Sequence, residues 1–265
     1  MEFNFKKKFG QNFLTDKNLL DSIVSLSGAD DNSLVLEIGP GAGALTQAIA
    51  KKAKRVISFE IDKELEPVLA ENLKDYDNAT IVFRDFMKLS DDEIQKFVGN
   101  DYMVIANLPY YITSPILFKL FESKNPPKSL TIMVQKEYGE RMVAKPSTSE
   151  YSSLSVLCDY LGEAKIVKNV SRKMFTPAPK VDSCIVNFVF NGKSYDEELA
   201  KFIKCCFAMR RKTLLNNLAQ GLNLSKDVIV KVLNDNQINE QVRAETLSFD
   251  EINKLYQSMK NQNIL

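Results

Sequence analysis

Residues Leu34 to Thr46 read Leu-Val-Leu-Glu-Ile-Gly-Pro-Gly-Ala-Gly-Ala-Leu-Thr, and this stretch decides the fold. An apolar run of strand length ends at Ile38, alternate glycines form a turn, and a helical pattern begins at Leu45. Because glycine lacks a Cβ, the backbone of the turn can adopt positive φ and allow a ligand to lie directly against it. The stretch therefore predicts a strand, a glycine turn that binds a ligand, and a helix.

The spacing of the glycines restricts which ligand this turn can hold. Gly39, Gly41 and Gly43 form G-x-G-x-G, which differs from the G-x-G-x-x-G pattern of pyrophosphate-binding turns. Nucleotide-like ligands bind such turns at the carboxyl ends of parallel strands. A tight strand-to-helix connection that holds no ligand is the alternative for this motif taken alone.

Composition indicates a folded protein outside the membrane. The chain has 265 residues, of which 45% are hydrophobic and 26% are charged. No apolar run approaches the roughly 20 residues that span a bilayer, so we expect a cytoplasmic protein with no membrane partner. The chain has no histidine, which excludes His-ligated metals and His-based hydrolases, and its cysteines lack C-x-x-C spacing. We expect no metal site.

Acidic residues follow the next two strand-like runs. Glu60 comes directly after the run Arg55 to Phe59 and lies 19 positions beyond Gly41. This separation is close to the roughly 20 residues expected for an acid that binds a ribose hydroxyl, although Glu60 could also simply begin a helix. Asp85 and Phe86 follow a third run, where a carboxylate can accept from an adenine amino group, or where a plain turn aspartate can stand.

A fourth apolar run, Tyr102 to Ala106, leads into the turn Asn107-Leu108-Pro109-Tyr110. The asparagine oxygen and a carbonyl held by proline can accept both hydrogens of an exocyclic amine, while the tyrosine ring stacks on the base. Such a turn would orient a weak nitrogen nucleophile toward an electrophilic methyl group. An ordinary proline turn is the alternative. Ser114 and Pro115 then read as the start of a helix.

Strands alternate with helices up to Asn191-Gly192, and only helical patterns follow. This order predicts an α/β fold with a doubly wound, mainly parallel sheet and a small C-terminal all-helical domain. We expect domains at residues 1–192 and 193–265. In a doubly wound sheet, the glycine turn and the turn after Ala106 would lie at the same edge.

The net charge is only +1, yet basic residues gather in two segments. Lys6-Lys7-Lys8 form a basic N-terminal arm, and residues 199–226 carry basic side chains, including Arg210, Arg211 and Lys212, with no acid. Both segments could contact phosphates. The alternatives are a frayed terminus and a solvated helix surface.

Taken together, the motifs resemble the rRNA adenine N6,N6-dimethyltransferase family of the kasugamycin-resistance type. The matching segments are Phe9-Gly-Gln-Asn-Phe-Leu14, Glu37-Ile-Gly-Pro-Gly41, Glu60-Ile-Asp62, Asn107-Leu-Pro-Tyr110, Gln135-Lys-Glu137, Phe175-Thr-Pro-Ala-Pro-Lys-Val-Asp-Ser183 and Arg210-Arg-Lys-Thr213. The resemblance implies a Rossmann-like class I methyltransferase fold, S-adenosyl-L-methionine as cofactor, and dimethylation of two adjacent adenosines in the 3′-terminal hairpin of 16S small-subunit rRNA. It also implies a monomer that acts on the immature small ribosomal subunit and has a role in ribosome biogenesis.

The resemblance assigns roles by matching position. Cofactor residues would be Asn12, Leu14, Gly39, Gly41, Glu60, Ile61, Asp85, Phe86 and Asn107. Catalytic residues would be Asn107, Leu108, Pro109, Tyr110 and Phe175, with the rings of Tyr110 and Phe175 enclosing a flipped adenine. RNA-binding residues would be Lys6, Lys7, Lys8, Lys180, Arg210, Arg211 and Lys212.

Three alternatives stay open at this point. An erythromycin-resistance type enzyme would dimethylate large-subunit rRNA, although the segments at Gly10–Leu14, Phe175–Ser183 and Arg210–Thr213 favour the small-subunit type. A nicotinamide-dependent oxidoreductase would also suit the glycine turn, but the Tyr-x-x-x-Lys spacing occurs only at Tyr256 to Lys260, in the helical tail. The third alternative is a non-catalytic ribosome-assembly factor.

Overall fold

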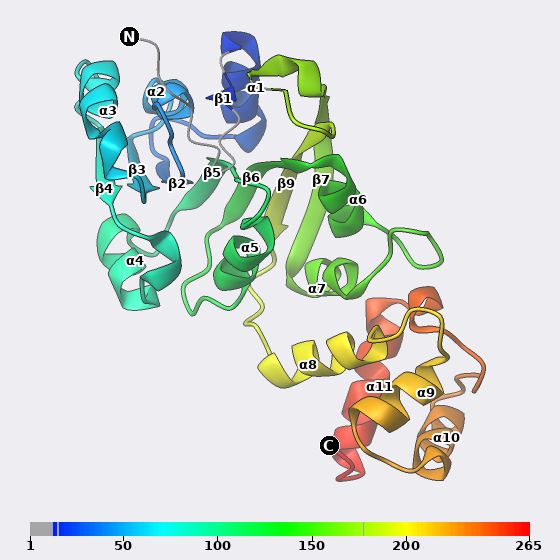
Figure 1. Cartoon of the computed structure of the whole chain (residues 1–265). Coiled ribbons are helices and arrows are strands. Elements are labelled where there is room, and N and C mark those ends of the chain that lie inside the picture. The colour runs from blue at the N-terminus through cyan, green and yellow to red at the C-terminus, as the bar shows by residue number, and fades with distance from the viewer. Residues whose placement is uncertain (1–12, 15, 177) are drawn as a thin grey trace. The chain divides into compact units, whose positions relative to one another are not determined.

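The computed structural model describes residues 13, 14, 16–176 and 178–265, and it divides the chain into two compact units (Figure 1). The sheet unit comprises the chain up to Gly139 together with Glu163–Asn191. The helical unit comprises Glu140–Gly162 and Gly192–Leu265. The boundary between the units falls within helix α6 (Lys136–Val143).

The described part of the sheet unit contains a seven-stranded sheet in the order β4-β3-β2-β5-β6-β9-β7. Its strands are β2 (Leu34–Ile38), β3 (Arg55–Glu60), β4 (Ala79–Phe83), β5 (Met103–Asn107), β6 (Ser129–Gln135), β7 (Gly162–Val170) and β9 (Ser183–Phe190). Each neighbouring pair from β4 to β6 is parallel, whereas β9 runs antiparallel to β6. The predicted doubly wound, mainly parallel sheet is therefore confirmed.

Helices cover the two faces of this sheet. Those on one face are α1 (Lys17–Ser27), α2 (Ala44–Ala50) and α3 (Glu66–Leu73), and those on the other include α4 (Asp91–Val98) and α5 (Thr113–Phe121) (Figure 1). The side chains of Val35, Leu36, Val56 and Ile57 are almost fully buried. Burial on both faces explains why β2 and β3 read as continuous apolar runs.

Local sequence sets the helix ends. The Asp16 side chain accepts from the Leu19 amide (2.9 Å), and Gly28 ends α1 in the left-handed conformation at φ +73°. The prediction that α5 starts at Ser114 and Pro115 is wrong. The helix begins at Thr113 with Ile112 as its N-cap, and the Thr113 hydroxyl donates to the Pro109 carbonyl (3.1 Å).

The helical unit contains α7 (Ser153–Leu161), α8 (Glu197–Cys206), α9 (Leu214–Gly221), α10 (Lys226–Asp235) and α11 (Phe249–Asn261), the last four coloured yellow to red in Figure 1. The predicted first domain, 1–192, is interrupted, because residues 140–162 group with these helices. Helix α7 packs against α8 and α11, and the Tyr151 hydroxyl before it donates to the Leu247 carbonyl (2.9 Å). None of the described helices is both long and apolar enough to cross a membrane.

One close approach in the sheet unit predicts a large effect from a single methyl group. A Cβ added to Gly139 in α6 would collide with the Cys184 sulfur and lie 3.0 Å from Val186 Cγ2. We therefore expect Gly139→Ala to lower the free energy of unfolding by about 1–3 kcal/mol, measured by chemical denaturation. Cys184→Ala in the same chain should recover part of this loss, because it removes the colliding atom. A Gly139→Ala protein as stable as the unmodified chain would contradict the packing described here.

Candidate active site

The turns that follow β2, β3, β4 and β5 enclose a cavity of about 210 Å³. It lies beside the junction of β2 and β5, where the strand order reverses, and doubly wound sheets bind their ligands at this point. The predicted site residues that line it are Gly39, Gly41, Glu60, Ile61, Asp85, Phe86, Asn107, Leu108, Pro109, Tyr110 and Phe175. The structure thus brings the predicted cofactor and base residues to one cavity, and their individual roles stay predictions.

The glycine turn has the backbone geometry that the sequence predicts. Gly39, Gly41 and Gly43 have φ values of +73°, +57° and +86°, which residues other than glycine rarely adopt. A Cβ added at Gly39 would lie 4.0 Å from Pro109 Cδ, which is an ordinary contact. The backbone conformation, rather than a lack of space, therefore requires glycine here, and the two turns lie directly against each other.

Glu60 sits at the end of β3 with its carboxylate turned toward the glycine turn. Its oxygens accept from the backbone amides of Gly41 (3.3 Å), Ile61 (2.8 Å) and Asp62 (2.9 Å). The residue is only 4% exposed, and burial raises the pKa of its carboxyl group against the opposing effect of these amides. A carboxylate has about four acceptor positions, so one remains for a ligand hydroxyl.

Glu37 is a second buried acid in the cavity wall, and the sequence analysis gave it no role. Its Oε2 accepts from the hydroxyls of Thr46 (2.7 Å) and Ser58 (2.6 Å), whereas its buried Oε1 has no partner among the described residues. Burial raises the pKa of this carboxyl group to about 7. In the sequence, Glu37 stands out as a single acid inside an apolar strand. A buried carboxylate oxygen without a partner costs roughly 1–3 kcal/mol, so an acid at such a position suggests that a ligand donates to it.

The turn from Asn107 to Tyr110 joins β5 to α5. The Pro109 carbonyl already accepts from the Ile112 amide (3.1 Å) and the Thr113 hydroxyl (3.1 Å), so both of its lone pairs are used. The Leu108 carbonyl accepts from no other described residue, while the Leu108 amide donates to the Met133 carbonyl (3.2 Å). Of the Leu108 and Pro109 carbonyls, only that of Leu108 has lone pairs that no other described residue uses, so it is the carbonyl that can accept from an amine.

Two of the aromatic residues that line the cavity are Tyr110, in this turn, and Phe175. The Tyr110 hydroxyl shares a hydrogen bond with the Ser183 hydroxyl (2.7 Å). Phe175 belongs to the short strand β8 (Phe175–Thr176) and is buried, with 4% of its surface exposed. Strand β8 pairs with β1 (Phe13–Leu14), which places the backbone of Leu14 opposite Phe175.

Asp85 and Phe86 lie in the turn after β4. The Asp85 carboxylate accepts from the Met87 amide (2.9 Å) and caps the short 3₁₀ helix Phe86–Lys88. The Phe86 ring is buried, with its centroid 5.8 Å from that of Phe59. The cap occupies one carboxylate oxygen of Asp85, so the turn role and a ligand role are compatible.

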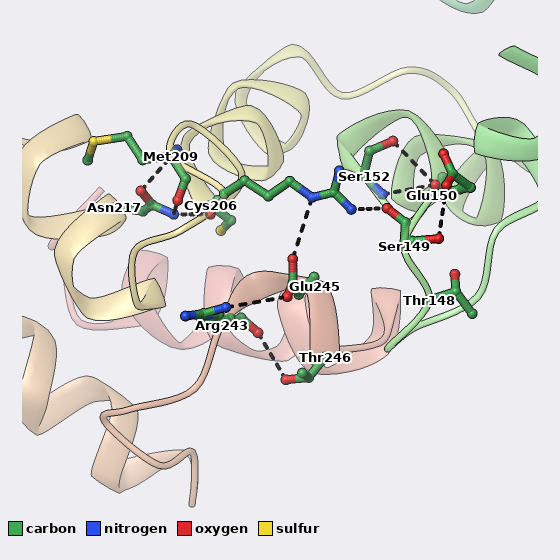
Figure 2. A network of polar contacts seen from close by, with 12 residues as sticks. Thr148, Ser149, Glu150, Ser152, Cys206, Met209, Asn217, Arg243, Glu245 and Thr246 are labelled. Carbon is green, nitrogen blue, oxygen red and sulfur yellow. Dashed lines mark hydrogen bonds and ion pairs between the residues drawn. The ribbon is translucent and has the colours of Figure 1, made fainter. Parts of the chain in front are cut away.

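The predicted basic residues of the helical unit differ in their surroundings. Arg210 donates to the Ser149 carbonyl and pairs with Glu245 (3.6 Å). Figure 2 shows Ser149 and Glu245 in the surrounding network of polar contacts. Arg211 and Lys212 are exposed and have no acidic partner among the described residues. In the same network, the buried Asn217 side chain accepts from the Met209 amide (3.2 Å) and donates to the Cys206 carbonyl (2.7 Å) (Figure 2). Arg210 therefore holds its loop against Ser149 and Glu245, whereas Arg211 and Lys212, the next two residues, are the exposed cations.

Lys6, Lys7, Lys8 and Asn12 lie outside the described residues, and only the backbone of Leu14 is described. In the sheet unit, Lys180 is exposed, and its carbonyl accepts from the Arg172 guanidinium (3.1 Å).

The fold and the cavity define a class of protein, the Rossmann-like α/β proteins that have a cavity at the switch point of the sheet. The chain belongs to the ribosomal RNA adenine dimethylase family, whose model matches residues 2–261. The family predicted from the motifs is confirmed, and membership leaves the nicotinamide-dependent oxidoreductase without support.

Curated relatives agree with this placement. Proteins of Bacillus cytotoxicus and Bacillus thuringiensis, each named "Ribosomal RNA small subunit methyltransferase A", are 45% identical to this chain over 260 residues. Each of these matches covers 94% of this chain and 89% of the relative. The similarity therefore extends over both units.

Solved structures share the fold. A dimethyladenosine transferase from Plasmodium falciparum has a TM-score of 0.81 and 26% identity, and the match covers 95% of this chain and 98% of that one. The 23S rRNA methyltransferase ErmE has a TM-score of 0.71 and 24% identity, with 94% and 100% covered. The second likeness shows the fold alone.

The buried Glu37 predicts a pH dependence of stability. Between its ordinary pKa of 4.5 and about 7, the folded protein holds a proton that the unfolded chain has released. Raising the pH through this window therefore lowers the free energy of unfolding, by up to about 3 kcal/mol from this group. Glu37→Gln cannot ionise, so its unfolding free energy between pH 5 and 8 should fall less steeply. Identical pH profiles for the two proteins would contradict the assignment.

Proposed function

We propose that this protein transfers methyl groups from S-adenosyl-L-methionine to the exocyclic amines of two adjacent adenosines in the 3′-terminal hairpin of 16S small-subunit rRNA. The observation that carries the proposal is that the turn from Asn107 to Tyr110 and the residues Gly39 and Glu60 line one cavity. Support for the small subunit comes from the name of the relatives at 45% identity.

The residues of the cavity fit this cofactor. The turn at Gly39 and Gly41 leaves the backbone open to a ligand, Glu60 keeps an acceptor position for ribose hydroxyls, and Asp85 can accept from the adenine amine. The unpartnered Glu37 Oε1 is suited to a donor such as an ammonium group. When bound, the cofactor supplies an electrophilic methyl group.

The turn after β5 would orient the nucleophile. The Asn107 side-chain oxygen and the Leu108 carbonyl accept the two hydrogens of the target amine, which leaves its lone pair free to point at the methyl group. A nitrogen–carbon bond would form as the sulfur–carbon bond to the transferred methyl group breaks, S-adenosylhomocysteine would be the leaving group, and one amine proton would be released to water. Tyr110 and Phe175 would hold the flipped base between their rings, and stacking of this kind is worth roughly 1–3 kcal/mol per base.

Exposed cations would bind the RNA backbone. Arg211, Lys212 and Lys180 are exposed, whereas Arg210 would act mainly by holding the loop that presents its neighbours. The partner would be the immature small ribosomal subunit, bound by a monomer in the cytoplasm. A role in small-subunit biogenesis follows from such a partner.

The proposal is tested with ribosomal subunits from a strain that lacks the modification. Small subunits, large subunits and isotopically labelled cofactor are incubated with the protein, and the rRNA is analysed by mass spectrometry. We expect two labelled methyl groups on each of two adjacent adenosines of the small-subunit RNA. Label in the large-subunit RNA alone would favour the erythromycin-resistance type, and no label in either would favour a non-catalytic assembly factor.

Removal of the Asn107 amide separates catalysis from binding. We expect Asn107→Ala to lower the rate of methyl transfer by at least about 100-fold, because the amine loses one of its two fixed acceptors. Binding to the small subunit, measured by co-sedimentation, should stay unchanged. Asn32→Ala is the matched control, since Asn32 lies on an exposed turn before β2. Full activity of Asn107→Ala would contradict the amine-gripping role.

Neutralising the free cations should change how RNA binding depends on salt. We expect Arg211→Gln with Lys212→Gln to weaken binding and to reduce the slope of log K against log salt by about 1.5, near 0.7–0.9 for each lost phosphate contact. The control is Lys231→Gln with Lys254→Gln, which removes two exposed charges from helices of the same unit. Equal slopes for the two double variants would place the RNA elsewhere.

A further inference from the structure

The two rings of the proposed base pocket come from segments far apart in the chain, and one dipeptide contacts both segments. Tyr110 is half-buried in the turn after β5, and its hydroxyl meets the hydroxyl of Ser183, 73 residues later, at 2.7 Å. Ser183 is fully buried at the first position of β9. A tyrosine hydroxyl is protonated at neutral pH, so either hydroxyl of this pair can be the donor; burial raises the pKa of the Tyr110 hydroxyl further.

Asp182, the residue before Ser183, holds together the ends of the segment that carries Phe175. The Asp182 carboxylate accepts from the Arg172 amide (2.9 Å), and its carbonyl accepts from the Lys136 amide (3.0 Å). The Arg172 guanidinium in turn donates to the Lys180 carbonyl (3.1 Å). These bonds join the two ends of the segment that contains Phe175, which lies three residues after Arg172 and seven before Asp182.

We infer that Asp182 and Ser183 are positioning residues that hold the Tyr110 and Phe175 rings in the geometry that receives the target base. The inference rests on the proposed function, because it assigns the supports of the same pocket. Neither residue lines the cavity, so each acts through the ring-bearing segment that it holds.

The physical benefit is pre-organisation. A tyrosine on a turn can rotate about its side-chain bonds, and immobilising a side chain on binding costs roughly 0.5–1.5 kcal/mol. The bond to Ser183 fixes the direction of the Tyr110 hydroxyl, and therefore limits the ring before the base arrives. The bond from the Arg172 amide to Asp182 likewise restricts the backbone at Arg172, three residues before Phe175.

The first test uses a double-mutant cycle on the hydroxyl pair. Ser183→Ala and Tyr110→Phe each remove one end of the same bond while keeping both rings. We expect each to lower kcat/KM for small-subunit RNA by about three- to tenfold, mainly by raising KM, with the double variant no worse than either single variant. The affinity for S-adenosylhomocysteine, measured by calorimetry, should change by less than about twofold.

Controls separate positioning from general stability. Ser183→Thr keeps the hydroxyl and should recover most of the lost kcat/KM. Thr131→Val removes a buried hydroxyl that accepts from Asn187 of the same strand β9 (3.1 Å), away from the cavity. We expect Thr131→Val to lower the melting temperature without changing KM for RNA.

The second test compares two replacements of Asp182. Asp182→Asn keeps an oxygen that accepts from the Arg172 amide, whereas Asp182→Ala removes it. We expect KM for RNA to rise about three- to tenfold in Asp182→Ala and to stay within about twofold in Asp182→Asn.

The outcomes distinguish the inference from the proposed function. If the unmodified protein methylates small-subunit RNA but Ser183→Ala and Tyr110→Phe keep full kcat/KM, the positioning role is wrong and the function stands. Additive losses in the double variant, or equal losses in Asp182→Asn and Asp182→Ala, would also overturn the inference. If the unmodified protein does not methylate this RNA, the proposed function itself fails.

Discussion

The parallel pairing of β2 with β5 is the constraint on which the site depends. The register aligns Val35 with Met103 and Leu36 with Val104, so the two strands end at the same edge of the sheet. The glycine turn and the turn after Asn107 then meet, with Gly39 against Pro109. Residues about seventy positions apart thus form one wall, because hydrogen bonds between parallel strands leave little freedom in how their ends align.

The electrostatics of the cavity follow from the absence of histidine and the presence of two buried acids. Glu37 and Glu60 both have raised carboxyl pKa values, chiefly through burial, and each carries an acceptor position that the protein does not fill. Such a wall is costly in the free protein and favourable toward a ligand that offers ammonium, hydroxyl or cationic groups. The unfilled acceptor positions of Glu37 and Glu60 therefore favour a ligand that donates hydrogen bonds to this wall.

The sequence predicted those features that depend on regular geometry. The spacing from Gly41 to Glu60 and the positions of Asp85 and Asn107 after apolar runs were enough to predict that these residues lie at one edge of the sheet, because the carboxyl ends of parallel strands meet there. The helix start at Thr113 was missed because its hydroxyl bonds backward to Pro109. The occupied Pro109 carbonyl is a consequence of the same turn.

Contacts between residues that are far apart in the chain could not be predicted from the sequence. Arg210 reads as an RNA contact in the sequence, but Ser149 and Glu245, which engage it, are distant along the chain. The same reason applies to the grouping of residues 140–162 with the helical unit, which depends on the packing of α7 against α8 and α11. The acid inside an apolar strand singles out Glu37, but the pairing of its oxygens depends on Thr46 and Ser58, which are 9 and 21 residues away in the chain.

The most direct test of the central claim is a crystal structure of the protein with S-adenosylhomocysteine and an RNA hairpin that carries the target adenosines. We expect the cofactor sulfur beside the glycine turn, the adenine ring between Tyr110 and Phe175, and the exocyclic amine within hydrogen-bonding distance of the Asn107 side chain and the Leu108 carbonyl. A cofactor bound outside this cavity, or an adenine that enters it without approaching Asn107, would contradict the account.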